Sequence, residues 1–293
     1  MNKKAIPLNK ANVIVVGVAR NCARTLRSRV AIIERAFRNA LNVSWLIVES
    51  DSTDRTLEIL QELKRERHNF NYDSLGTLRA KYPNRTERIA LCRNHYLKFV
   101  QNDFSQEKVD YVVVADLDHV NEKLDSTAIG SCWNRTDWDV CCANQTGLYY
   151  DIWALRHPLW SPNDCWAQAR MLQNYGMSRM RAISVSVHAR MLRIPENADW
   201  IEVDSAFGGI AIYQRSALNG AAYLGIGIDG TEVCEHVALH KTIKSNGGRI
   251  FINPRFINSG RVEHVSKSSG LRLAMKWIGS DFRSLINRLK SWC

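Results

Sequence analysis

The stretch YVVVADLD at residues 111–118 decides the fold predicted for this chain. An apolar, mostly β-branched run of this kind is typical of a strand buried on both faces of a parallel sheet. In open α/β sheets, ligands bind at the carboxyl ends of the strands. Asp116 and Asp118 follow the run directly, and alternation along an extended chain places both on the same side. The stretch therefore predicts a buried strand that ends in a ligand-binding pair of acids.

Further elements are predicted on both sides of this strand. Apolar runs at 13–18 and 44–49 predict two more strands, and helical spacing predicts helices over 23–41 and 53–67 and one that opens at Thr86. This alternation predicts βαβ units and a doubly wound, mostly parallel sheet with helices on both faces. Later strands are expected over 138–143, 206–213 and 249–254, and a helix over 233–245. Residues 150–200 lack clear periodicity and suggest a long insertion.

The chain shows no internal repeat and no low-complexity linker, so we expect one α/β domain over 1–268 with a C-terminal helix over 269–293. The domain divides into halves of about 12–120 and 121–268. The C-terminal helix is amphipathic and basic, a composition that suits an anionic membrane surface. Packing of this helix on the domain is the alternative.

Composition limits the possible partners and the compartment. The chain has 293 residues and a formal net charge of +11, which points to nucleic acid, anionic lipid or a phosphorylated ligand. No apolar run is long enough to span a bilayer, and the N-terminus does not resemble a signal peptide. We therefore expect a cytoplasmic protein, peripheral on the membrane face if the C-terminal helix binds lipid, with its eight cysteines reduced.

Charged and polar residues follow three successive strands. Arg20 follows the first, Glu49 and Asp51 follow the second, and Asp116 and Asp118 follow the third. Two carboxylates at one sheet edge repel each other unless a cation lies between them. Carboxylates together with phosphate oxygens are the usual ligands of Mg²⁺ or Mn²⁺ in proteins. These strand ends predict a site for a metal ion and a phosphorylated ligand.

The order and spacing of these motifs resembles a known family. The segments 13–20, 47–56, 89–94 and 113–118 are similar to the nucleotide-sugar half of family 2-like GT-A glycosyltransferases. The segments 150–156 and 234–236 resemble the cryptococcal-type, capsule-associated mannosyltransferases and their bacterial and viral relatives. The resemblance covers about 12–265. It implies a GT-A fold and metal-dependent transfer of a hexosyl or pentosyl group from a nucleotide-diphosphate sugar to a glycan or lipid-linked acceptor, in surface polysaccharide or glycoconjugate synthesis.

The resemblance also implies roles for individual residues. Asp118 would bind Mn²⁺ or Mg²⁺, Asp116 the ribose or the metal, and His264 matches a C-terminal histidine that binds metal or phosphate. Glu49 matches the acid that contacts the base or ribose, while Ser50 replaces the acid usually found next to it. The residues implied in donor binding are Arg20, Glu49, Asp51, Arg88, Arg93, Asp116, Gly208 and Gly209.

For the acceptor side, the resemblance implies candidate residues without one assignment for each role. Glu235 is the first candidate for the base that deprotonates the acceptor, followed by Glu232 and Asp229, because the usual Glu-Asp pair is Glu235-His236 here. In a retaining enzyme these acids would instead orient donor or acceptor. Tyr150, Asp151 and Trp153 are candidates for an acceptor platform, because flat aromatic rings suit sugar faces.

Two other functions fit parts of the sequence. A nucleotidyltransferase acting on sugar phosphates also uses an acid pair, but residues 16–20 make a poor phosphate loop. A basic nucleic-acid-binding protein would explain the charge, but the basic residues are dispersed and match no recognition motif. A dehydrogenase is not favoured, because no Gly-x-Gly-x-x-Gly follows the first strand. We therefore expect a sugar-nucleotide donor and no nucleic-acid partner.

Overall fold

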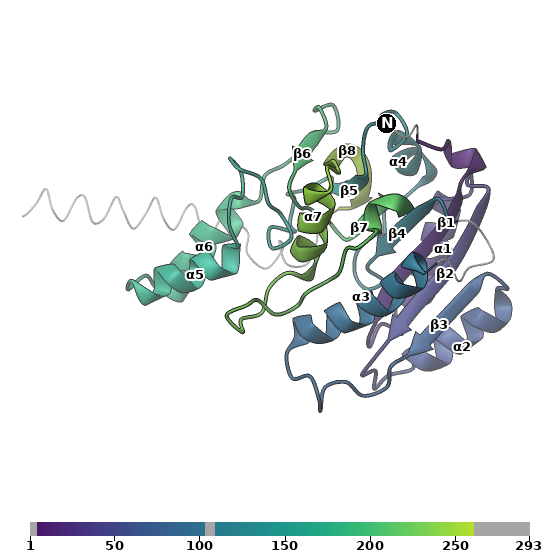
Figure 1. Cartoon of the computed structure of the whole chain (residues 1–293), viewed down its shortest axis with the longest axis horizontal. Coiled ribbons are helices and arrows are strands. Elements are labelled where there is room, and N and C mark those ends of the chain that lie inside the picture. The colour runs from purple at the N-terminus through teal and green to yellow at the C-terminus, as the bar shows by residue number, and fades with distance from the viewer. Residues whose placement is uncertain (1–4, 103–108, 261–293) are drawn as a thin grey trace, which may run out of the picture.

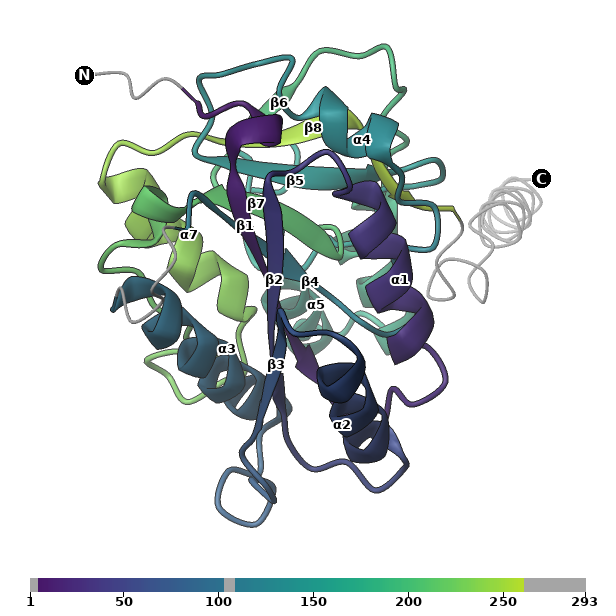
Figure 2. The same cartoon turned by 90° about the vertical axis from the view of Figure 1, so that its right-hand side faces the viewer.

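An eight-stranded sheet with the order β3-β2-β1-β4-β7-β5-β8-β6 forms the centre of the computed structural model (Figures 1 and 2), which describes residues 5–102 and 109–260. Parallel pairs join β1 to β2 and β4, β2 to β3, and β5 to β8. Strand β7 is antiparallel to both β4 and β5, and β6 is antiparallel to β8. The strands are β1 (Asn12–Ala19), β2 (Asn42–Glu49), β3 (Phe70–Ser74), β4 (Tyr111–Ala115), β5 (Val140–Gln145), β6 (Ile201–Val203), β7 (Ile210–Gln214) and β8 (Ile250–Ser259).

Helices cover both faces of the sheet, with α1, α2 and α4 on one face and α3 and α7 on the other (Figure 2). Alternation along β1 explains this arrangement, because Val13 and Val15 join one apolar core while Ile14 and Val16 join the other. The doubly wound α/β fold predicted from the sequence is confirmed. The α-helices are α1 (Leu26–Ala36), α2 (Thr56–Glu66), α3 (Arg85–Gln101), α4 (Ser126–Ser131), α5 (Cys165–Asn174), α6 (Arg179–Ser186) and α7 (Glu235–Ser245), with 3-10 turns at Leu8–Lys10, His188–Arg190 and Arg215–Leu218.

The structure corrects several predicted elements. Strand β3 was not predicted because Phe70 is its one fully buried residue, so its sequence lacks an apolar run. The strand expected from 206 begins only at Ile210, since Gly208 and Gly209 adopt φ angles of 75° and 91°. The 150–200 segment contains α5 and α6, whose buried positions are few and small. The helix predicted over 269–293 lies outside the described residues.

Seven cysteines of the described residues are free, buried thiols, and Cys293 lies outside that part of the chain. Across 5–102 and 109–260, no helix combines the length and apolar character that crossing a bilayer requires.

His240 connects α7 to the centre of the sheet. Its ring lies between Ser205 Oγ, 2.8 Å from Nδ1, and Tyr213 OH, 2.9 Å from Nε2. The side chain is fully buried, and this desolvation lowers the pKa of His240 from 6.5 to about 3. The imidazole therefore stays neutral in the folded protein over the whole physiological range.

This burial makes stability depend on pH. The unfolded histidine binds a proton below about pH 6.5 and the folded one only near pH 3, so stability is lost as the pH falls through this window, by about 1.4 kcal/mol per pH unit. Between pH 7 and pH 5, the free energy of unfolding should fall by about 2 kcal/mol less in His240→Gln than in the wild type. Urea unfolding at both pH values measures this difference. The exposed His68, changed to Gln, is the control; a pH dependence unchanged in His240→Gln would contradict the assignment.

Candidate active site

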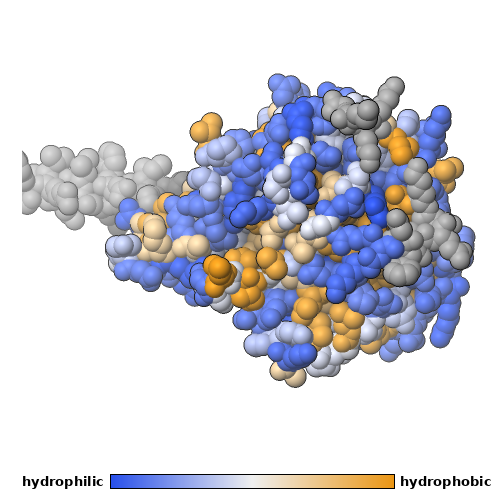
Figure 3. All heavy atoms as spheres, in the orientation of Figure 1, coloured by the Kyte–Doolittle hydropathy of each residue, from blue (hydrophilic) through white to orange (hydrophobic). Residues whose placement is uncertain are grey.

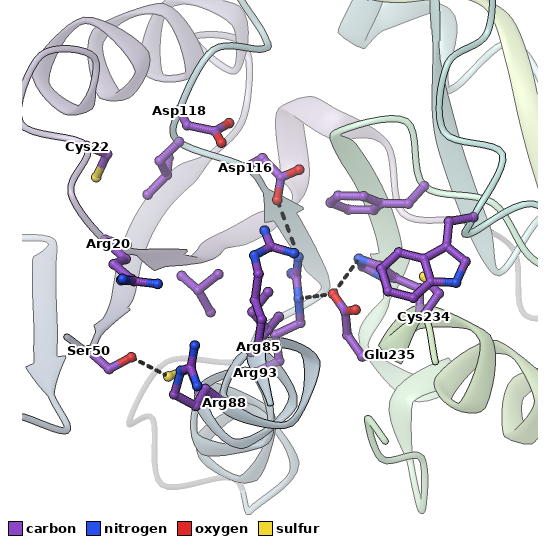
Figure 4. A pocket seen from close by; sticks show the side chains of 18 of the residues that line it. Arg20, Cys22, Ser50, Arg85, Arg88, Arg93, Asp116, Asp118, Cys234 and Glu235 are labelled. Carbon is purple, nitrogen blue, oxygen red and sulfur yellow. Dashed lines mark hydrogen bonds and ion pairs between the residues drawn. The ribbon is translucent and has the colours of Figure 1, made fainter. Parts of the chain in front are cut away.

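A cavity of about 270 Å³ opens where the carboxyl ends of β1, β2 and β4 meet the N-terminal parts of α3 and α7. Figure 4 shows this cavity from close by, with the first half of the chain on the left and the second half on the right. Its position agrees with the general rule for ligand sites in open α/β sheets. Polar and charged residues that line it are Arg20, Ser50, Asp51, Arg85, Arg88, Arg93, Asp116, Asp118, Tyr150, Asp151, Glu235 and His236.

Arg93 lies at the centre of this site (Figure 4). From α3, its Nε donates to Glu235 Oε1 over 3.0 Å and its Nη2 to Asp116 Oδ1 over 3.3 Å. Its Nη1 donates to the hydroxyl of Tyr96, and only 4% of the side chain is exposed. The guanidinium also lies over the ring of Phe207, 5.4 Å from its centroid. One buried cation therefore joins α3, the end of β4 and the start of α7.

The acid pair lies in the cavity wall as the sequence predicts, since both Asp116 and Asp118 line it. Burial raises the pKa of Asp116 to about 7, and the charge of Asp118 adds to this although Arg93 opposes it. Asp118 is exposed at the cavity mouth. Among the described residues, no three His, Cys, Asp or Glu side chains form a metal-binding group, and His264 lies outside these residues. A cation here would need ligand oxygens besides the two carboxylates.

Of the four arginines that line the cavity, two are buried and bonded to other protein groups, and two are exposed. Arg88 donates from Nη1 to the carbonyl oxygens of Tyr82 and Pro83, so its guanidinium fixes the loop before α3. Arg20 and Arg85 are exposed side chains that line the cavity mouth. Arg85 was not among the site residues predicted from the sequence. A cation in the first turn of a helix opposes the helix dipole, and this unfavourable placement could have indicated a functional role.

The acids after β2 have different environments. Glu49 is buried and accepts from Ser52 N and Ser74 Oγ, so it holds the turn after β2 and does not line the cavity. Asp51 lines the cavity, with a left-handed φ of 58°. Its carboxylate accepts from two backbone N–H groups of the segment after β3. The structure therefore places Asp51, and not Glu49, at the cavity surface.

The opposite wall contains the predicted acceptor residues Tyr150, Asp151 and Trp153. Asp151 Oδ2 accepts from Gly208 N over 2.9 Å, and burial raises the pKa of Asp151. A Cβ on Gly208 would lie 2.8 Å from a backbone oxygen, which explains the glycine there. Gly208 and Gly209 do not line the cavity themselves; they place the preceding Phe207, which does.

Two side chains at the start of α7 line the cavity, Glu235 and His236. The His236 ring stacks on Phe207 with centroids 3.9 Å apart, and it is 2% exposed. Neither ring nitrogen has a hydrogen-bond partner among the described residues. Burial, and then the charge of Arg93, keeps the pKa of His236 well below 6.5, so the ring is a neutral acceptor. No role was predicted for this histidine from the sequence.

The other two predicted base candidates have structural contacts away from the cavity. Glu232 Oε1 accepts from Thr86 N and Oγ1, and thereby ties the loop before α7 to the first turn of α3. Asp229 Oδ1 accepts from the N–H and hydroxyl of Thr231, within an exposed turn. Neither residue lines the cavity. Of the three acids, the structure brings Glu235 alone to the cavity.

Solved structures of other proteins have a similar fold. No protein-family model and no curated protein matches the chain. Among solved structures, S. aureus TarS (1-349) with UDP-GlcNAc is 14% identical with a TM-score of 0.51, covering 86% of this chain and 59% of that one. GalNAc-T7 with UDP, GalNAc and Mn²⁺ is 14% identical with a TM-score of 0.50, covering 87% and 45%.

These likenesses confirm the fold predicted from the sequence: the chain has the GT-A fold of glycosyltransferases. It spans 59% of the TarS chain and 45% of the GalNAc-T7 chain. The resemblance to capsule-associated mannosyltransferases stays a prediction.

Replacing Arg93 with a neutral residue should lower the stability of the protein. Arg93→Met leaves Glu235 and Asp116 without their buried partner, so we expect a loss of about 3–5 kcal/mol in the free energy of unfolding. Adding Glu235→Gln should recover part of this loss, because one unpaired charge disappears. Arg20→Met is the matched control, since Arg20 lines the same cavity but is exposed. Equal urea midpoints for Arg93→Met and Arg20→Met would refute the central role.

Proposed function

We propose that this protein is a metal-dependent glycosyltransferase that moves a hexosyl or pentosyl group from a nucleotide-diphosphate sugar to an acceptor hydroxyl. One observation carries the proposal: in a GT-A fold, the acid pair Asp116 and Asp118 lines the same cavity as the exposed Arg20 and Arg85. Acids next to cations suit a metal–diphosphate complex, which presents both signs of charge.

The donor is proposed to lie on the side of the cavity formed by β1, β2 and the start of α3. Arg20 and Arg85 carry the charge to meet a diphosphate, because a guanidinium binds phosphate oxygens in a bidentate manner. Ser50 and Asp51 line the same side and offer acceptor oxygens to ribose hydroxyls or base N–H groups. The UDP-GlcNAc in TarS and the UDP in GalNAc-T7 support a nucleotide here.

The residues present fit a divalent cation, Mn²⁺ or Mg²⁺. The pKa of Asp116 near 7 reflects burial and, after the opposing Arg93, the repulsion from Asp118, which a cation would relieve. Such ions commonly use one or two carboxylates together with substrate phosphates. Asp118 and Asp116 would hold the ion, which when bound would neutralise the diphosphate leaving group. His264 remains a candidate for a further ligand.

The acceptor is proposed to lie against Tyr150, Asp151, Trp153 and Phe207. Glu235 is the proposed base that takes the proton of the acceptor hydroxyl in an inverting reaction, and Arg93 orients its carboxylate through the bond to Oε1. The neutral His236, 3.7 Å from Glu235 Oε1, is the alternative proton acceptor. The proposed acceptor is a glycan or a lipid-linked glycan of surface polysaccharide or glycoconjugate synthesis.

Donor binding gives the first test. We expect a thermal-shift panel of UDP, GDP and their sugars with Mn²⁺ to contain members that raise Tm; a ligand at 100 times its Kd adds about 2.7 kcal/mol. Asp118→Ala should keep the Tm of the ligand-free protein but lose the Mn²⁺-dependent part of the shift. Asp199→Ala, an exposed acid remote from the cavity lining, should keep the full shift. A panel without any stabilising nucleotide would sink the proposal.

The chemical step gives the second test. Glu235→Gln should lower kcat by about 10²- to 10⁴-fold with the donor-induced Tm shift preserved, because a general base contributes that much. Glu232→Gln should lower Tm but keep kcat, since Glu232 holds Thr86. Release of nucleoside diphosphate from the donor measures turnover; release of pyrophosphate would indicate a nucleotidyltransferase. If His236→Asn loses turnover and Glu235→Gln does not, the base is His236.

A further inference from the structure

The α5–α6 hairpin projects from the body of the domain (Figure 1) and exposes several large apolar side chains. The side chains that the two helices bury are small: Cys165 and Ala169 in α5, and Ala182 and Ser186 in α6. By contrast, Met171, Met180 and Tyr175 at the turn are exposed by 49%, 71% and 86%. Exposed apolar side chains gathered on one projection mark an interaction surface.

A neighbouring loop extends this surface. Leu224 is 57% exposed and Ile228 is fully exposed, in the loop 224–232 that leads into α7. Hydrogen bonds from Thr231 lower the pKa of Asp229, and the charge of Arg170 on α5 contributes least, so Arg170 and this loop lie within electrostatic range of each other. Figure 3 shows cream and orange spheres over the hairpin and this loop, at the lower left of the domain.

The hairpin part of this surface is basic, whereas the loop 224–232 adds the exposed acids Asp229 and Glu232. Between 165 and 195 the chain has five arginines and no acid. Arg170, Arg179 and Arg181 are exposed on the hairpin itself. Basic side chains interspersed with Met, Tyr, Leu and Ile match the composition of segments that lie in the headgroup region of an anionic bilayer.

Charge distinguishes between the possible binding partners of this surface. The segment 261–293 has seven basic and two acidic residues, and a second copy of the chain has a net charge of +11, so both would be repelled by this surface. A nucleic acid would satisfy the arginines but leave Tyr175, Met180 and Ile228 in water. An anionic lipid surface can pair with the arginines and also bury the apolar side chains.

We propose that the α5–α6 hairpin and the loop 224–232 form a docking surface for an anionic lipid bilayer. The surface is attached to the acceptor wall of the cavity. Asp164 caps α5 through the N–H groups of Trp166 and Ala167 and also accepts from Trp153 Nε1, while the loop continues into Glu235. Docking would therefore bring the acceptor wall close to the bilayer. The surface stands on its own whether or not glycosyl transfer is the reaction.

Vesicle flotation of the full chain tests this surface. We expect binding to phosphatidylglycerol-containing vesicles, little binding to pure phosphatidylcholine, and a decrease with salt. Arg179→Gln/Arg181→Gln should weaken binding about fivefold per arginine, and Tyr175→Ser/Met180→Ser about tenfold. Arg38→Gln/Leu41→Ser is the matched control, because it removes one exposed cation and one exposed apolar side chain far from the hairpin.

Three outcomes would overturn this assignment. Equal vesicle binding by wild type and both hairpin variants would place any lipid contact elsewhere, for example in 261–293. Loss of a dimer in sedimentation without vesicle binding would identify a second copy as the occupant. RNA binding lost only with the arginines, again without vesicle binding, would identify a polyanion site. The Tm shift by nucleotide with Mn²⁺ serves as the fold control, and its absence in the wild type would count against the proposed function alone.

Discussion

The buried guanidinium of Arg93 is the interaction on which the site depends. A charge with 4% of its side chain exposed must be paired, and its partners Glu235 and Asp116 come from α7 and from the end of β4. Arg93 lies 23 positions from Asp116 and 142 from Glu235 along the chain, yet one ion-pair network holds the three together. The network thereby joins the walls of the cavity.

The network also sets the electrostatics of the cavity. Arg93 compensates Glu235 and Asp116 in part, and Asp118 and Asp151 add further carboxylates to a cavity that the exposed Arg20 and Arg85 also line. Groups with perturbed pKa values in a cleft are typical of functional sites. Carboxylates next to exposed arginines favour a ligand that carries both signs of charge, such as an anion bound to a metal cation. The charge pattern thus supports the class of ligand proposed above.

The two walls of the cavity continue into different outer surfaces. The wall proposed to bind the donor is built from β1, β2 and α3 and is supported by loop contacts such as those of Arg88 and Asp51. The opposite wall continues through Asp164 into the α5–α6 hairpin and through Glu235 into the loop 224–232. The net charge of +11 is consequently distributed, with part of it facing the cavity mouth and part on the projecting hairpin.

The sequence by itself determined the strands β1, β2 and β4, because buried parallel strands require apolar runs that few other structures tolerate. It also determined that Asp116, Asp118 and Arg20 meet, since parallel strands end at one edge. Only the tertiary structure decided between Glu235, Glu232 and Asp229, which lie within seven residues of one another, because a turn sends neighbouring side chains in different directions. Only packing against Phe207 and Arg93 left His236 neutral and without a hydrogen-bond partner, and burial of this kind depends on contacts between residues far apart in sequence.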